Sequence, residues 1–290
     1  MIFWLLLALG LTRSGELPGG PSRDVQVFTD VEYCVTSGTT LRMDIYVPRS
    51  ARESSAPAVL HVHGGGWQAG TKKDFVEMRM MYPLMDAGYV VASAQYRFAP
   101  KHPFPAPVED VKCAVRWLRA NAERYHINPD RIGALGASAG GHLVTMLGVA
   151  DEKAGFEGCG GHADKSSRVQ AVANFYGPVD LTSEIKTPLL VRVRNDEFPT
   201  KELWKQGSPI NYVSPDDPPF LIVHGGDDDI VPVSQSTMLE SRLREAKVPV
   251  ELVVVKNGNH ILSPVRGTAS PGLKVVSRKV VSFFDRTLKQ

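Results

Sequence analysis

Two alternating patterns of apolar and polar residues run along the chain. Short runs rich in Val, Ile, Leu and Tyr, bounded by glycine, proline and polar residues, are typical of strands. Longer segments with apolar residues every three or four positions are typical of helices. The predicted strands cover residues 25–35, 41–47, 58–62, 89–96, 131–137, 169–176, 220–224 and 250–255. The predicted helices cover residues 75–87, 108–125, 140–149, 234–246 and 273–287.

The alternation of these elements predicts the fold class. Strands separated by helices favour an α/β domain with a mostly parallel sheet, here of eight strands, covered by helices on both faces. We expect this domain to span residues 23–290. Residues 178–216 interrupt the rhythm between the sixth and seventh strands and combine prolines, charged residues and Trp204. They predict a short insertion that leaves the adjoining site open to bulky substrates.

One segment at a predicted strand-to-helix junction is a candidate for nucleophilic chemistry. It reads Gly136-Ala137-Ser138-Ala139-Gly140. A Gly-x-Ser-x-Gly turn in this setting exposes the serine hydroxyl at the top of a sheet, and the turn is so tight that only small residues fit around it. Serine also occurs by chance in turns of small residues, so the pattern requires partner residues elsewhere in the chain.

A glycine-rich loop follows the third predicted strand and reads His63-Gly64-Gly65-Gly66-Trp67. Backbone N–H groups of such a loop, with that of the residue after the nucleophile, bind the negative oxygen of an acyl-transfer intermediate. We therefore predict Gly65, Gly66 and Ala139 as oxyanion donors, and we assign Trp67 to substrate binding. A phosphate-binding loop would end in Gly-Lys-Ser/Thr, which Trp67-Gln68 does not match.

Candidates for an acid and a base follow two late strands. Asp227, Asp228 and Asp229 come directly after the seventh strand, and His260 follows the eighth. A histidine can take the proton of Ser138, and one carboxylate can orient it, although charge alone does not say which of the three does so. The chain order of serine, acid and histidine is that of α/β-hydrolases.

The remaining histidines are expected to have structural roles. His63 and His224 open the two loops and are expected to hold them through hydrogen bonds. His61 and His63 alternate along a strand, but the neighbouring sequence supplies no third ligand for a metal. We therefore predict no metal and no cofactor.

Taken together, the motifs resemble the α/β-hydrolase serine esterases related to hormone-sensitive lipase, most closely the compact bacterial feruloyl and acetyl esterases. The resemblance covers the chain from about Val31 to its C-terminus. The motifs that carry it are His63-Gly-Gly-Gly-Trp67, Tyr96-Arg97-Phe98-Ala99-Pro100, Asn128-Pro129-Asp130-Arg131, Ser138-Ala139-Gly140-Gly141-His142 and Asp217-Pro218-Pro219-Phe220.

The resemblance implies a carboxylesterase that acts through an acyl-enzyme on short-chain or aromatic acyl esters, including esters of carbohydrates. It implies Asp228 as the acid, with Asp229 as the fallback, and a short cap at residues 178–216. The segment Gly258-Asn259-His260-Ile261 departs from relatives, which often have a small residue before the histidine. The alternatives are an amide-cleaving relative, such as an arylformamidase or a serine peptidase, and a binding module without catalysis.

Composition and the N-terminus bear on compartment and partners. With 290 residues, 43% hydrophobic and 22% charged, and a formal net charge of +2, the chain has the profile of a globular enzyme and gives no reason to expect nucleic acid as a partner.

Residues 1–22 combine a short apolar run with a linker and predict a signal peptide, hence a secreted or periplasmic protein. An uncleaved anchor or a mis-assigned start, leaving a cytoplasmic protein, are the alternatives, and no membrane span is expected. The oligomeric state stays open.

The chain contains three cysteines. Cys113 falls in a predicted helix and is expected to be a buried small apolar residue. Cys34 and Cys159 can pair in an oxidising compartment, but their separation in sequence does not establish contact.

Overall fold

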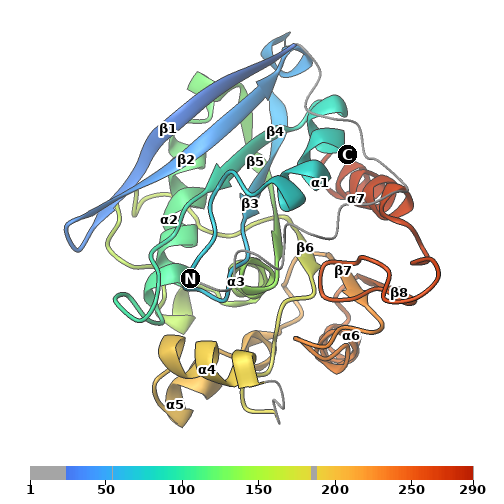
Figure 1. The fold of residues 1–290 in the computed structure, drawn as a ribbon. Coiled ribbons are helices and arrows are strands. Elements are labelled where there is room, and N and C mark those ends of the chain that lie inside the picture. The colour runs from blue at the N-terminus through green and yellow to red at the C-terminus, as the bar shows by residue number, and fades with distance from the viewer. Residues whose placement is uncertain (1–23, 54, 184–187, 290) are drawn as a thin grey trace.

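The computed structural model describes residues 24–53, 55–183 and 188–289, so the predicted leader and linker, residues 1–22, lie outside the described residues. One eight-stranded sheet has the order β1-β2-β4-β3-β5-β6-β7-β8 (Figure 1). Its strands are β1 Val25–Thr36, β2 Thr39–Pro48, β3 Ala56–Val62, β4 Val90–Ala94, β5 Ile127–Ala137, β6 Ala171–Phe175, β7 Phe220–Gly225 and β8 Val250–Val255. The predicted eight-stranded α/β fold is thereby confirmed.

The first two strands form a hairpin, and the other six run parallel. Strand β1 pairs with β2, and β2 with β4, in antiparallel fashion, whereas every later neighbouring pair from β4 to β8 is parallel. The hairpin turns at Ser37 and Gly38, which have φ of 47° and 72°. Positive φ at both central residues of a two-residue turn matches the twist of the flanking strands.

Helices cover both faces of the sheet. Helices α1 Phe75–Asp86 and α7 Leu273–Leu288 lie on one face, and α2 Ala106–Ala120, α3 Ala139–Val149 and α6 Ser234–Glu245 pack on the other. Strand β3 shows how the core is divided, because Leu60 points into the cluster that contains α3, whereas Val59 points into the cluster that contains α7. A strand buried on both sides explains why this segment reads as a continuous apolar run.

Helix α2 corrects one sequence prediction, since it ends at Ala120 and not at residue 125. The side-chain amide of Asn121 donates to the carbonyl of Trp117, and the backbone N–H of Asn121 does the same. Such local hydrogen bonds compete with continuation of a helix. A short 3₁₀ turn, η2 Glu123–Tyr125, follows, and the left-handed residue His126 leads directly into β5.

The insertion between β6 and β7 contains elements that periodicity did not predict. They are α4 Pro188–Glu197, α5 Lys201–Gln206 and the 3₁₀ turn η4 Pro209–Tyr212. Figure 1 shows α4 and α5 together at the lower side of the molecule. A Cβ on Gly66, in the loop after β3, would lie 3.3 Å from Cγ1 of Val193. Helix α4 therefore packs directly on the predicted oxyanion loop.

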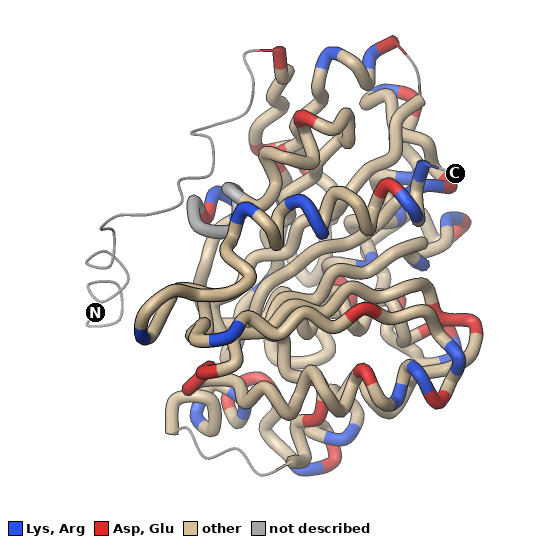
Figure 2. Tube along the Cα trace, turned by 90° about the vertical axis from the view of Figure 1, so that its right-hand side faces the viewer, with Lys and Arg blue, Asp and Glu red and all other residues tan. Residues whose placement is uncertain are grey.

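Charged residues of both signs are distributed over the molecule. Figure 2 shows Lys and Arg interspersed with Asp and Glu along the trace. Within the part of the chain that the structure describes, no helix is both long and apolar enough to cross a membrane.

Candidate active site

Ser138 lies in the turn that joins β5 to α3. Its φ of 54° and ψ of −118° are unusual for a residue with a side chain, and its N–H donates to the carbonyl of Phe175 over 2.9 Å. A Cβ on Gly136 would overlap the backbone of Gly140, and one on Gly140 would overlap the carbonyl of Val62. Close backbone packing on both sides thus holds the serine in a conformation of high energy.

A chain of two hydrogen bonds joins three distant segments. Oγ of Ser138 lies 2.9 Å from Nε2 of His260, and Nδ1 of His260 lies 2.7 Å from Oδ2 of Asp228. A carboxylate accepts, so Nδ1 carries the proton and Nε2 is left to accept from the hydroxyl. The structure therefore brings together the three residues that the sequence predicted as nucleophile, base and acid.

The carboxylate of Asp228 has three further polar protein atoms around it. Its Oδ1 accepts from the N–H groups of Ile230 and Val231 at 2.9 Å each, and its Oδ2 lies 3.1 Å from Nε2 of His224. Burial alone would raise its pKa, but hydrogen bonds from His224 and His260 hold the pKa of Asp228 well below its usual range. The group is therefore ionised at neutral pH although its side chain is 0% exposed.

The two neighbouring aspartates differ from Asp228 in position. Asp229 is exposed, and a carboxylate oxygen of Asp227 lies 3.6 Å from the guanidinium of Arg266. Neither is the hydrogen-bond partner of His260. The geometry thus distinguishes three consecutive carboxylates that charge alone could not separate.

His260 lies on a loop that its own neighbours organise. Oδ1 of Asn259 accepts from the N–H groups of Ile261 and Ser263 at 3.1 and 3.0 Å, which closes a tight turn around the histidine. The ring of Tyr176 lies 4.7 Å from the ring of His260, centroid to centroid. The departure at Asn259 therefore has a structural role, and Tyr176 is a supporting residue that the sequence analysis did not identify.

The loop after β3, which holds two predicted oxyanion donors, lies against the start of the helix that follows the nucleophile. Gly65 and Gly66 have φ of 113° and 60°, and a Cβ on Gly65 would overlap the carbonyl of Ala69. The third predicted donor, Ala139, follows Ser138 and is the first residue of α3. A Cβ on Gly140 would also reach the carbonyl of His63, so the loop and the start of α3 are in backbone contact.

The assignment of Trp67 to substrate binding is corrected by its environment. The side chain is 1% exposed, and its Nε1–H donates to Nδ1 of His142 over 3.2 Å. The other nitrogen of His142 donates to the carbonyl of Gly207 over 2.7 Å, and burial lowers the pKa of this histidine to about 4. A positive φ of 59° turns Trp67 inward. It ties the oxyanion loop to α3 and the insertion and does not line an open site.

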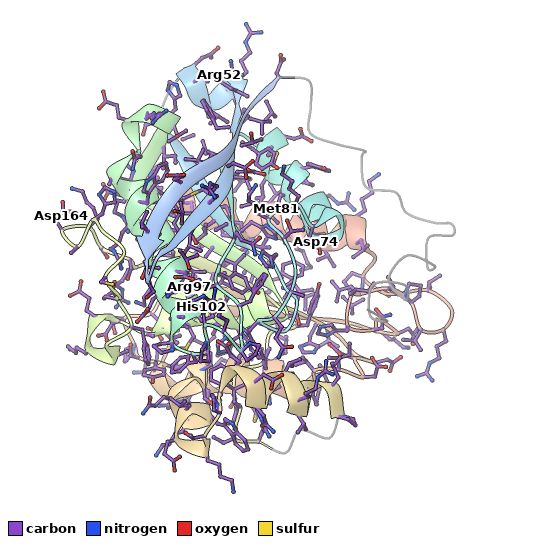
Figure 3. The ribbon with its side chains drawn as sticks, turned by 60° about the vertical axis from the view of Figure 1, so that its left-hand side comes forward. Arg52, Asp74, Met81, Arg97, His102 and Asp164 are labelled. Atoms are coloured by element: carbon purple, nitrogen blue, oxygen red, sulfur yellow. The ribbon has the colours of Figure 1, made fainter. Side chains whose placement is uncertain are left out.

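A second charged cluster lies between α2 and the insertion. Nε of Arg97 donates to Asp110 over 2.9 Å, and a second guanidinium nitrogen lies 2.6 Å from the same carboxylate, which is 0% exposed. Figure 3 labels Arg97 close to His102, between the sheet and the insertion helices. Glu109 contributes a longer contact of 3.3 Å to Arg97. The Glu109-Asp110 pair is therefore a packing element that holds Arg97.

Glu197, the last residue of α4, is a buried acid near this cluster. It is 1% exposed, and its Oε2 has no hydrogen-bond partner among the described residues. Burial, followed by the negative charge of Asp110, raises the pKa of Glu197 to about 9. The carboxyl is therefore protonated at neutral pH, a state that no sequence pattern indicated.

Histidines that open the two site loops hold them as expected. Nδ1 of His63 lies 2.7 Å from the carbonyl of Gly64, and Nε2 of His224 lies 2.9 Å from that of Val231. Within residues 24–53, 55–183 and 188–289, no group of three or more His, Cys, Asp or Glu side chains is arranged to hold a metal ion.

Two comparisons connect this arrangement with known proteins. The chain is 30% identical over 250 residues to the probable carboxylic ester hydrolase LipM of Mycobacterium tuberculosis, a match that covers 80% of this chain and 56% of LipM. The esterase LipQ of the same organism is 31% identical over 264 residues, with 87% of this chain and 61% of LipQ covered. The chain thus spans little more than half the length of these relatives.

Solved structures match over nearly the whole chain. A truncated carbohydrate esterase from gut microbiota is 30% identical with a TM-score of 0.79, and the match covers 94% of this chain and 100% of that one. Thermogutta terrifontis esterase 2 is 25% identical with a TM-score of 0.72, and the match covers 95% and 97% of the two chains. These matches confirm the α/β-hydrolase fold and the predicted resemblance to esterases.

The family itself follows from a match to a sequence profile. That profile covers residues 43–243, which include the oxyanion loop, Ser138 and Asp228 but end before His260. The chain belongs to the BD-FAE family.

Proposed function

We propose that the protein is a serine carboxylesterase that hydrolyses esters through an acyl-enzyme on Ser138. The observation that carries the proposal is the continuous chain from the Ser138 hydroxyl through His260 to Asp228. The adjoining Gly65-Gly66 loop supports it, since backbone N–H groups beside a nucleophile are what an acyl-transfer intermediate needs. The ester hydrolases among the relatives support the same reaction class.

The proposed reaction uses protein groups and water alone. Oγ of Ser138 attacks the ester carbonyl while Nε2 of His260 takes its proton, and the ionised Asp228 stabilises the imidazolium. N–H groups of Gly65, Gly66 and Ala139 bind the negative oxygen. His260 then protonates the departing alcohol, and a water molecule attacks the acyl-enzyme in the same way and releases the acid.

As the substrate class we propose short-chain or aromatic acyl esters, including those attached to carbohydrates. Support comes from a neighbour described as a carbohydrate esterase and from another described as an acetyl ester-xyloside bifunctional hydrolase. The contact between Val193 and the position of Gly66 also limits the space beside the oxyanion loop. Relatives named arylacetamide deacetylase match 41% and 47% of this chain, so amides belong in the same test.

The decisive variant is Ser138→Ala. Removal of a triad nucleophile lowers turnover by on the order of 10⁴- to 10⁶-fold, because only binding and oxyanion stabilisation remain. The measurement is hydrolysis of p-nitrophenyl acetate by the purified protein and its variant, with unfolding curves to show that both are folded. A fluorophosphonate probe should label the original protein on Ser138 and leave the variant unlabelled.

A substrate panel then separates the alternatives. Acetyl, feruloyl and longer acyl esters, acetylated xylan, N-formylkynurenine and proline-linked peptides are offered at equal concentration. Highest kcat/KM on acetyl or feruloyl esters supports the proposal, and preference for an amide would establish the amide-cleaving alternative. A folded protein that hydrolyses none of them and resists the fluorophosphonate probe would be a binding module.

A further inference from the structure

All three cysteines of the chain gather at one loop, although they come from distant segments. Cys34 lies in β1, Cys113 in α2, and Cys159 in the loop that follows the 3₁₀ turn η3 Glu152–Ala154. The thiols of Cys34 and Cys113 lie 3.5 and 3.0 Å from the same carbonyl oxygen, that of Gly160. Two side chains far apart in sequence thus converge on a single backbone atom.

The sulfur atoms of Cys34 and Cys113 are direct neighbours. A Cβ placed on Gly160 would overlap both sulfurs, so the two thiols lie against the same side of this glycine. The sulfur of Cys159 instead lies 3.8 Å from Oγ1 of Thr36, and Cys159 is exposed. All three cysteines are free in the structure, and the thiol that lies next to Cys34 is that of Cys113.

Positive charge holds the loop against the two buried cysteines. Nε of Arg116 donates to the carbonyl of Gly161 over 3.2 Å, and a terminal nitrogen of its guanidinium donates to Glu157 over 2.8 Å. The hydrogen bond from Cys34 and, after it, the charge of Arg116 lower the pKa of Cys113. A thiolate is the reactive form of cysteine, so this environment favours nucleophilic attack by its sulfur.

A surface hollow gives reagents a route to this pair. Its volume is about 450 Å³, and its lining includes Cys34, Cys159, Gly160 and Trp117. Figure 3 shows the same loop, marked by Asp164, at the periphery of the molecule. Cys34 lines the hollow, whereas Cys113 lies behind it, and the two side chains are 4% and 1% exposed. Access to the pair from the hollow therefore requires the loop to move.

We propose that Cys34 and Cys113 are a thiol-oxidation site that forms a disulfide between β1 and α2 in the presence of a small-molecule disulfide such as glutathione disulfide. The Cys113 thiolate attacks one sulfur of the reagent, whose S–S bond breaks and releases one glutathione thiolate. Cys34 loses its proton to solvent and attacks the Cys113 sulfur, which expels the second glutathione. Two cysteine thiols are oxidised, and one glutathione disulfide is reduced to two glutathiones.

The position of this disulfide gives it a consequence for the rest of the domain. The chain between Cys34 and Cys113 contains β2, β3, β4 and the oxyanion loop. Closing a long segment restricts the unfolded chain and so stabilises the folded state, by an amount that grows with the length of the loop. Oxidation would therefore fix the antiparallel edge of the sheet to the helix behind it.

The test is a disulfide map of the whole chain. Purified protein is incubated with glutathione disulfide at pH 8, its free thiols are alkylated in denaturant, and the peptides are identified by mass spectrometry. The expected product is one linked peptide pair joining Cys34 to Cys113, with Cys159 alkylated or bound to glutathione. The oxidised protein should melt about 5 °C or more above the reduced one, and dithiothreitol should reverse the change.

Matched variants separate this pair from its neighbour. Cys159→Ser should retain both the crosslink and the rise in melting temperature, whereas Cys113→Ala should lose both. A crosslink between Cys34 and Cys159 in the original protein would overturn the proposal. The proposal would also be overturned if Cys34 and Cys113 were both fully alkylated, and hence still reduced, after the oxidant had modified Cys159. Both readouts use the original protein, so poor folding of a variant does not remove the test.

Discussion

Asp228 and Glu197 are two buried carboxyl groups in opposite chemical states. Two backbone N–H groups of the loop after β7, together with His224 of β7 and His260 of the loop after β8, surround Asp228 and keep it ionised. The end of α4 leaves one oxygen of Glu197 without a hydrogen-bond partner among the described residues, which keeps it protonated. Burial raises the pKa of both, so the difference lies in the donors that each region supplies.

This contrast separates a region built to hold charge from one that tolerates only a neutral acid. A histidine that becomes an imidazolium needs a fixed negative partner, and Asp228 is already desolvated and ionised before any proton moves. Glu197 lies where α4 meets the Arg97–Asp110 pair, and a second negative charge there would repel Asp110. Three substitutions test the contrast, beginning with the largest expected effect.

Asp228→Asn should lower kcat by about 10⁴-fold, because an amide donates where the carboxylate accepted and leaves His260 in the wrong tautomer. Ester hydrolysis measured under saturating substrate gives this value. The matched control is Asp229→Asn, which changes the same charge at an exposed position one residue away and should retain activity within about threefold. A comparable loss in both variants would show that the loop as a whole, and not the Asp228 carboxylate, sustains the reaction.

Asp110→Asn should destabilise the folded state by about 3–5 kcal/mol, since it leaves the Arg97 guanidinium buried without its charged partner. Urea unfolding followed by circular dichroism measures the difference. Glu109→Gln provides the comparison, because this half-buried residue makes only the longer contact with Arg97 and should change stability by less than about 1 kcal/mol. Equal effects would mean that Asp110 is not the main partner of Arg97.

Glu197→Gln should change how stability depends on pH. Between pH 4.5 and about 9 the unfolded chain releases the Glu197 proton while the folded protein keeps it. Stability of the original protein therefore falls as pH rises through this window, and the loss is complete once the folded group ionises. The variant lacks this loss, so its stability relative to the original should rise steadily between pH 4.5 and pH 8.5.

Unfolding free energies at several pH values give the slope for each protein. Glu202→Gln, on the exposed side of the neighbouring helix α5, serves as the control and should leave the slope unchanged. Parallel slopes for the original protein and Glu197→Gln would show that Glu197 is already ionised at neutral pH.

Local sequence patterns predicted most of the helices and strands. The spacing of apolar residues and the residue types in turns depend only on neighbours in the chain. All eight strands and five of the longer helices were predicted, and helix α2 was extended too far since the capping amide of Asn121 carries no periodic signal. The helices of the insertion were missed, as α4 and α5 are short. Their stability comes largely from packing on the domain below.

Site residues were predictable where a local motif fixes the backbone. Residues whose role depends on contacts between remote segments were not. Ser138 and His260 followed from motif and chain order, whereas the choice of Asp228 needed the family resemblance or the coordinates. The burial of Trp67 was not foreseen, because its ring is held in the core by contacts with remote residues such as His142. Glu197 was missed because its protonation state depends on its burial in the folded chain and, after that, on the charge of Asp110, which is 87 positions away.

The contact of Gly140 with the carbonyl groups of Val62 and His63 has a consequence for how this protein can change over evolutionary time. The spacing between nucleophile and oxyanion loop is set by main-chain atoms, which substitution of side chains leaves in place. Residues of the insertion other than those that contact the oxyanion loop, such as Val193, can therefore be exchanged without resetting the distances on which the reaction depends. Residues around the site can thus change while the main-chain contact between the nucleophile turn and the oxyanion loop stays the same.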